Sequence, residues 1–160
     1  FFLGPVVVGL AVPLYHHFHS MKKQILIILL AITAGSFSTV GIAVALTDYW
    51  IGIDTITNSM AGKSVTTPVS VAITEQINGI PALAAAFVMV TGIIGAAIIP
   101  ALLKWLKLDS PQSTGIALGT CAHAVGTSRA IELGQEHVAY AAMSMTLTAS
   151  LHALILPWLF

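Results

Sequence analysis

Long apolar stretches without charge are the feature that most constrains this chain. Residues 24–46 and 82–103 contain no Asp, Glu, Lys or Arg, and each is longer than the roughly 20 residues that span a bilayer core. Only 8% of the chain is charged, whereas a soluble domain carries about 25%. The apolar residues form long blocks instead of alternating, which excludes an outer-membrane barrel. The sequence therefore predicts an all-α, polytopic transmembrane protein embedded in a lipid bilayer.

The two ends of the chain also predict membrane segments, at 1–15 and 135–160. The chain opens on FFLGPVVVGLAVPLY with no Met, basic region or A-x-A cleavage site, which argues against a signal peptide. We expect a single domain over residues 1–160, with one or more N-terminal membrane segments missing. His16, His17 and His19 follow the first run. His16 and His19 could share a helical face, but no carboxylate or thiolate nearby completes a metal site.

Composition excludes several functions. Net charge is zero and no basic cluster exceeds Lys22-Lys23, so nucleic-acid binding has no electrostatic basis. Cys121 is the only cysteine, which rules out a disulfide framework. Without a His-Glu-x-x-His or Gly-x-Ser-x-Gly motif, an enzyme is not predicted. We expect neither a metal nor another cofactor.

Two segments, 51–78 and 110–134, are too polar or too broken for plain spans and predict interrupted helices. In the first, Thr67-Pro68 within KSVTTP predicts a helix start, because Thr can cap a helix and Pro fits its first position. In the second, we predict a cap at Ser110, a break at 124–126, a restart at Thr127-Ser128 and a stop at Gly134. Such breaks survive at membrane depth only inside protein or beside a wet cavity.

The two interrupted segments are related by a shift of 57 residues. This shift places Gly62 on Gly119, Glu75 on Glu132 and Pro100 on Pro157, and paired interrupted segments are typical of transporter binding sites. If residues 51–78 enter and return as a hairpin, the basic loops at 22–23 and 104–107 face the same side and the repeat is inverted. If the segment crosses once, they face opposite sides. The positive-inside rule favours the hairpin, and both interpretations stay open.

Ionisable residues within apolar segments mark a candidate binding site. Helices restarting at Thr67 and Thr127 would point N-terminal amides at the membrane centre, where they attract anions. Arg129 in the first turn would favour a carboxylate and grip it bidentately. The alternative is an Arg129–Glu132 ion pair. Lys63 either binds the same solute or extends its ammonium to the interface.

The predicted substrate-binding residues all flank the two breaks. They are Lys63, Ser64, Thr66, Thr67, His123, Gly126, Thr127, Ser128 and Arg129. His123, Glu132 and Glu75 are candidates for proton coupling, because an imidazole or a buried carboxyl can exchange protons near neutral pH. For Glu75, an interfacial position at a helix end is the preferred interpretation.

Four runs carry a resemblance to a known family. They are KSVTTP at 63–68, GIP at 79–81, TGIIGA at 91–96 and AHAVGTSRAIE at 122–132. Together with Gly4-Pro5 and Pro13, they closely resemble the LrgB/CidB family of bacterial membrane proteins. The resemblance implies antiholin-like control of murein hydrolases with an LrgA/CidA-type partner, or transport of carboxylates such as pyruvate and, in plastids, glycolate or glycerate. It also implies discontinuous helices that cross at mid-membrane, which favours single crossings.

These observations support one hypothesis and one alternative. The hypothesis is a multi-pass carrier of the bacterial cytoplasmic membrane that moves a small monocarboxylate by alternating access, with the solute between the two breaks. The alternative is a regulatory or pore-forming subunit that assembles with an LrgA/CidA-like partner or with copies of itself through its glycine-rich faces.

Overall fold

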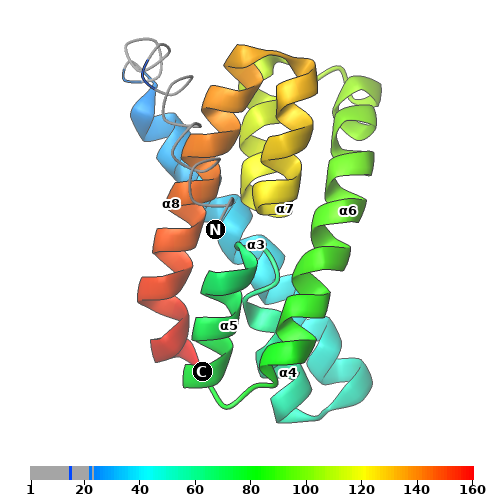
Figure 1. The fold of residues 1–160 in the computed structure, drawn as a ribbon, viewed down its shortest axis with the longest axis vertical. Helices are drawn as coiled ribbons and strands as arrows, with labels where there is room; N and C mark the ends of the chain where they lie inside the picture. Colours follow the sequence, from blue (N-terminus) through cyan, green and yellow to red (C-terminus); the bar gives the residue numbers. More distant parts are fainter. Residues whose placement is uncertain (1–14, 16–21, 23) are drawn as a thin grey trace.

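The described residues of this chain form an all-helical structure (Figure 1). The computed structural model describes Tyr15, Lys22 and residues 24–160, so the predictions for residues 1–14 and for His16, His17 and His19 lie outside them. The helices bounded within the described part are α3 (Ile25–Ile51), α4 (Asp54–Ala61), α5 (Thr67–Gln76), α6 (Pro81–Trp105), α7 (Pro111–Leu133) and α8 (Gln135–Leu159).

Three of these helices, α3, α6 and α8, are long and apolar enough to cross a membrane by length and composition. They confirm the helices predicted at 24–46, 82–103 and 135–160, although α3 continues through Asp48 and Trp50 to Ile51. Side chains on α3 and α6 are mostly exposed, whereas half of the apolar window of α8 is buried. The core is therefore built around α8.

Two pairs of short helical segments approach the middle of the molecule from opposite ends (Figure 1). The chain descends along α3, turns, and runs up α4 and back down α5 before α6 carries it to the other end. There α7 runs inward, bends, and returns to the same end, where α8 begins. The bend is at His123, whose φ of 42° and ψ of −130° are non-helical.

The bend lies earlier than the break predicted at 124–126. Gly126 belongs to the returning half of α7, and a Cβ there would collide with the carbonyl oxygen of Leu118. Leu118 also shares a buried cluster with Ala130, so the two halves pack against each other. The glycine therefore allows close approach of the two halves, and His123 provides the change of direction. As a result, Arg129 lies in the second turn after the bend instead of the first.

Local signals set several helix ends. The Ser113 amide donates to Ser110 Oγ over 3.1 Å, which confirms the predicted cap, and Gly134 ends α7 with a φ of 133°. The α5 start differs by one residue from the prediction. Thr66 occupies the N-cap position without a side-chain cap bond, and Thr67 is the first helical residue.

Small residues let α7 pack closely on α8. A Cβ on Gly115 would lie 2.7 Å from Tyr140 Cβ, and one on Gly119 would collide with Ser144 Oγ and the Ala141 carbonyl. Because backbone atoms cannot give way as a flexible side chain can, Gly115 and Gly119, four residues apart on α7, fix how near the helices lie.

We predict that Gly119→Ala destabilises the protein, by about 1–3 kcal/mol as for other overpacked cores. Gly41→Ala is the matched control, because a Cβ on Gly41, also in a helix, meets nothing within 4 Å. Thermal unfolding of the detergent-solubilised protein measures both. The unfolding midpoint should fall for Gly119→Ala and stay level or rise for Gly41→Ala, and equal midpoints would contradict the packing described.

Candidate functional site

The connection between α4 and α5, residues 62–66, is anchored in the middle of the molecule. Val65 is 1% exposed and belongs to a buried cluster with Val40 of α3 and Leu156 of α8. The neighbouring Ser64 hydroxyl donates to Thr39 Oγ1 of α3 over 3.5 Å. These contacts with α3 and α8 hold the backbone that follows Lys63, and so limit where the Lys63 side chain can lie.

Lys63 brings a cation to this position without an acidic partner. Its side chain is half-buried, and its ammonium lies within electrostatic range of Cys121 on α7 and of His152 on α8. Within the described part of the chain, the ion pair formed is that of Arg129 with Glu132. A half-buried charge with no counter-charge is costly in apolar surroundings, so the position favours a bound anion.

His152 meets α3 one turn away from the point where Ser64, next to Lys63, meets it, and one ring nitrogen of His152 is unused. The residue is 1% exposed, Nε2 contacts the Ser36 hydroxyl of α3, and Nδ1 has no partner among the described residues. The buried hydroxyls of Thr120 and Thr148 also have none in this part of the chain. An unsatisfied buried polar group costs about 1–3 kcal/mol, so these atoms are poised to accept a ligand or water.

We call these residues the central polar cluster. It comprises Ser36, Thr39, Lys63, Ser64, Thr120, Cys121 and His152.

A cavity leads from one end of the molecule toward this cluster. Its volume is about 430 Å³, and α3 and the first half of α7 line it. Gln24 and Gln112, near the N-termini of these helices, lie on its wall, as do Thr120 and Cys121. The volume is in the range of small-molecule sites. The cavity therefore gives a small solute room as far as Thr120 and Cys121, and Lys63 is not among the residues that line it.

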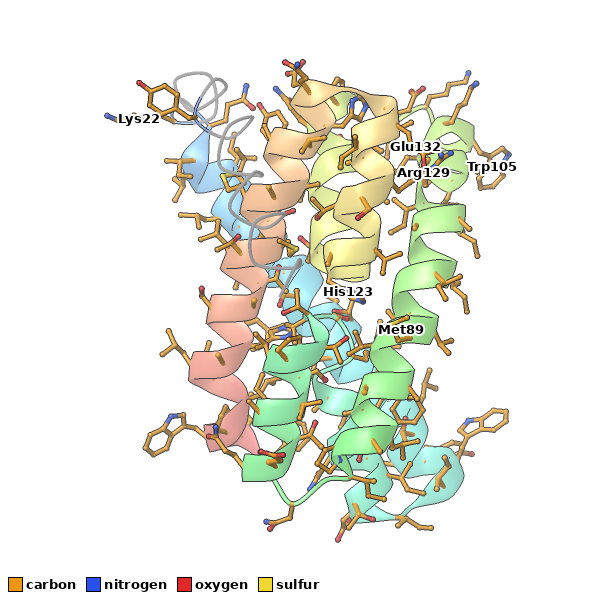
Figure 2. The ribbon with its side chains drawn as sticks, in the orientation of Figure 1. Lys22, Met89, Trp105, His123, Arg129 and Glu132 are labelled. Atoms are coloured by element: carbon orange, nitrogen blue, oxygen red, sulfur yellow. The ribbon has the colours of Figure 1, made fainter. Side chains whose placement is uncertain are left out.

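The bend of α7 is held against α6 through His123. The residue is 2% exposed, and its Nε2 lies 3.0 Å from the Val88 carbonyl oxygen. A Cβ on Gly92 would lie only 2.7 Å from the ring, so the absence of a side chain there makes room for the imidazole. Figure 2 shows His123 at the inner tip of α7, near Met89 of α6.

Arg129 and Glu132 lie away from the bend, toward the end of α6 marked by Trp105 (Figure 2). They form an ion pair with side chains 42% and 64% exposed, which is the alternative interpretation of the sequence. Glu75 is exposed in the last turn of α5.

The other predicted residues of α7 contact atoms of α7 itself. The Thr127 hydroxyl donates to the His123 carbonyl over 2.8 Å and Ser128 to Ala124 over 3.0 Å, while Gly126 lies against Leu118. Of the predicted binding residues, Lys63 and Ser64 belong to the central polar cluster. Thr66 and Thr67 follow them at the half-buried start of α5.

The sequence interpretation gave no role to His152, Thr148 or Ser36. A signal was present on α8, because Ser144, Thr148 and His152 recur at four-residue spacing and all three are buried. Such spacing places the three side chains on one helix face. An ionisable residue inside an apolar span is itself a sign of function, so His152 could have been selected from the sequence.

Comparisons with known proteins agree on one family. The sequence model of the LrgB-like family matches residues 1–160. The chain is 39% identical to the protein YxaC of Bacillus subtilis over 162 residues, covering 99% of this chain and 70% of that protein. It is 35% identical to YwbG of the same organism over 158 residues, covering 98% and 70%. The antiholin-like protein LrgB of Bacillus cereus is also 35% identical, with 98% and 68% covered. No solved structure matches the chain.

We predict that Gly92 and His123 are energetically coupled. Gly92→Ala alone should lower stability by about 1–3 kcal/mol, because the new methyl group meets the imidazole. In a His123→Ala background the same change should cost less, although Val125 Cβ, 3.0 Å from where the new carbon would lie, remains. A double-mutant cycle of unfolding free energies measures the difference. If the unfolding free energies lost in the two single variants simply add in the double variant, the His123 imidazole does not pack against Gly92.

Proposed function

The chain belongs to the LrgB-like family, and from that premise we propose that it is a carrier for a small carboxylate anion in the bacterial cytoplasmic membrane. The observation that carries this proposal is the half-buried ammonium of Lys63, which has no acidic partner among the described residues. In an ion-pair network that only stabilises a fold, each charged side chain has an oppositely charged partner within the protein. A cation without a counter-charge, within electrostatic range of Cys121 on the wall of a cavity, instead favours an exchangeable anion.

The chemistry of the cluster fits a monocarboxylate. A carboxylate only accepts hydrogen bonds, and Lys63 and the hydroxyl of Thr120 are donors. Charge-assisted bonds from the ammonium would be the strongest of these contacts. One cation balances one negative charge, which favours a monoanion over a dicarboxylate. Pyruvate and glycolate have this charge and fit a cavity of about 430 Å³.

We further propose that α4–α5 and α7 are re-entrant hairpins related as an inverted repeat. When the chain is shifted by 57 residues, the limits of α4 and α5 together, 54 and 76, fall on the limits of α7, 111 and 133. The connection at 62–66 falls on 119–123, so its last residue, Thr66, corresponds to His123 at the bend. The approach of the two bends from opposite ends in Figure 1 supports this pairing.

In this proposal α3, α6 and α8 are the crossings, and the basic residues set the orientation. Lys22 and Trp105 lie at the same end of the molecule (Figure 2), and Lys104 and Lys107 flank Trp105 in the sequence. The positive-inside rule makes this end cytoplasmic. The cavity beside α3 and α7 then opens to the cytoplasm, and alternating access requires that a second arrangement opens the cluster to the other side.

The proposal assigns a role to each of four other predicted residues. Ser64 holds the tip beside the solute, and Thr66 and Thr67 present the first amides of α5 toward it. Arg129, paired with Glu132, is assigned to the outer part of α7 and not to the solute.

The name of the Bacillus cereus relatives, antiholin-like protein, favours a second candidate function. On that alternative the chain is a regulatory or pore-forming subunit that acts with an LrgA/CidA-like partner on murein hydrolase activity. Proteoliposomes containing the purified protein separate the two. Saturable uptake that unlabelled carboxylate competes with supports the carrier, and leakage of dyes without chemical selectivity supports the alternative.

We predict that Lys63→Met abolishes saturable uptake of labelled pyruvate or glycolate into proteoliposomes, because it removes the charge while keeping most of the side-chain volume. Lys63→Arg should retain part of the uptake. Arg129→Ala is the matched control, since it removes a cation already paired with Glu132. Uptake by Lys63→Met at the parent rate, or its loss in Arg129→Ala alone, would overturn the assignment.

The re-entrant arrangement predicts which positions share a side of the membrane. In a Cys121→Ser background, cysteines at Asp109 and Glu136 should react with an impermeant maleimide from the cytoplasmic side. Cysteines at Asp54 and Asn78 should react from the opposite side. Inside-out and right-side-out vesicles provide the comparison. If α7 crossed the membrane once, positions 109 and 136 would be labelled from opposite sides.

A further inference from the structure

We propose that His152 binds the proton that accompanies the anion, so that the carrier moves an anion and a proton together. This inference rests on the proposed carrier function and adds to it the coupling ion and the residue that carries it. It is based on the buried ring nitrogen of His152 that has no partner among the described residues, and on the contacts of His152 and Ser64 with α3, which lie one turn apart.

The geometry leaves one nitrogen of His152 free to take a proton. Nε2 contacts the hydroxyl of Ser36, which can donate to it or accept from it. Nδ1 is buried and has no partner in the described residues. The ring is 1% exposed, so bulk water does not solvate a charge there. A proton on Nδ1 therefore needs a compensating negative charge inside the protein.

The groups that face His152 explain when that compensation is present. Lys63 approaches from the α4–α5 connection and is the charged group that acts on the imidazole. Ser36 of α3 is neutral, and the Cys121 thiol of α7 lies near Lys63. No Asp or Glu of the described residues acts on the ring. When no anion is bound, a proton on His152 would place a second positive charge near the Lys63 ammonium, which is unfavourable.

A bound carboxylate changes this balance. Its negative charge neutralises Lys63, so protonating Nδ1 no longer places two cations together. By linkage, if the anion strengthens proton binding, the proton strengthens anion binding by the same factor. The proton comes from water on the side where the anion enters and returns to water on the other side. Because the anion and the proton cancel, the loaded and the empty carrier have the same net charge, and transport is electroneutral.

The other candidates for coupling are less well placed. Nε2 of His123 bonds to the Val88 carbonyl at the bend. Glu132 is paired with Arg129 and its side chain is 64% exposed. Glu75 is exposed in the last turn of α5. Neither carboxylate touches the central polar cluster.

The test uses the full chain in proteoliposomes with labelled pyruvate. Two fluxes are measured: exchange of internal for external pyruvate without a pH gradient, and net uptake driven by acid outside. A gradient of about one pH unit should support up to about tenfold accumulation in the parent, because one proton moves with each anion. A pH dye inside the vesicles should report acidification that keeps pace with uptake.

His152→Gln and His152→Asn should lose the uptake driven by the gradient and show a weakened but saturable exchange, because Lys63 still binds the anion. Glu75→Gln and Glu132→Gln are the controls and should keep both fluxes. Retained exchange also shows that a variant is folded. Accumulation by either His152 variant at the parent level would overturn the role of His152.

Net uptake by the parent without any internal acidification would overturn proton coupling whatever the variants do. A parent that shows neither saturable exchange nor uptake would instead refute the carrier function on which this inference rests. The two failures are therefore distinct.

Discussion

A cation held partly away from water must be balanced, and the described part of this chain supplies no carboxylate for Lys63. The hydroxyl of Thr120, next to Cys121 in the sequence, and one nitrogen of His152 also have no partner among the described residues. Leaving several such groups unsatisfied costs several kcal/mol, at about 1–3 kcal/mol each. Thr57, Ser70 and Thr74, outside the cluster, also have hydroxyls without a partner among the described residues, so the unpaired cation is what distinguishes the cluster. A transient anion would compensate this cation, and for this reason we propose the cluster as a site.

The fold supports this cluster by satisfying the backbone elsewhere. The α4–α5 connection is held to α3 by the bond from the Ser64 hydroxyl to Thr39. The turn between α5 and α6 is tied to α4, where the Ile80 amide donates to Ser59 Oγ over 2.7 Å and Asn58 donates to the Ile77 carbonyl over 2.6 Å. The bend of α7 is closed by the bond between His123 and Val88 and by the contact of Gly126 with Leu118. Irregular backbone in apolar surroundings requires such internal partners. These contacts hold the two bends in place so that they can position side chains.

The sequence predicted local features well and long-range neighbours poorly. Ser110 as a cap and Gly134 as a stop depend on residues within one turn, so their roles can be read directly. The break of α7 was placed at 124–126 because glycine is the usual residue at such a point, but Gly126 serves close packing and His123 adopts the positive φ. Arg129 was favoured because it is charged and lies near the break, yet Glu132 satisfies it one turn away. The meeting of Lys63 with His152, which are far apart in sequence, depends on how α8 packs against the α4–α5 connection.

The central claim is that the Lys63 ammonium binds a carboxylate, and solid-state NMR of the protein in lipid bilayers tests it most directly. With ¹⁵N-labelled lysine and pyruvate ¹³C-labelled at the carboxyl carbon, the account predicts a dipolar coupling between that carbon and one lysine Nζ. The coupling should disappear in Lys63→Arg, which has no Nζ. Bound pyruvate that shows no coupling to Lys63, or a coupling that persists in Lys63→Arg, would contradict the account.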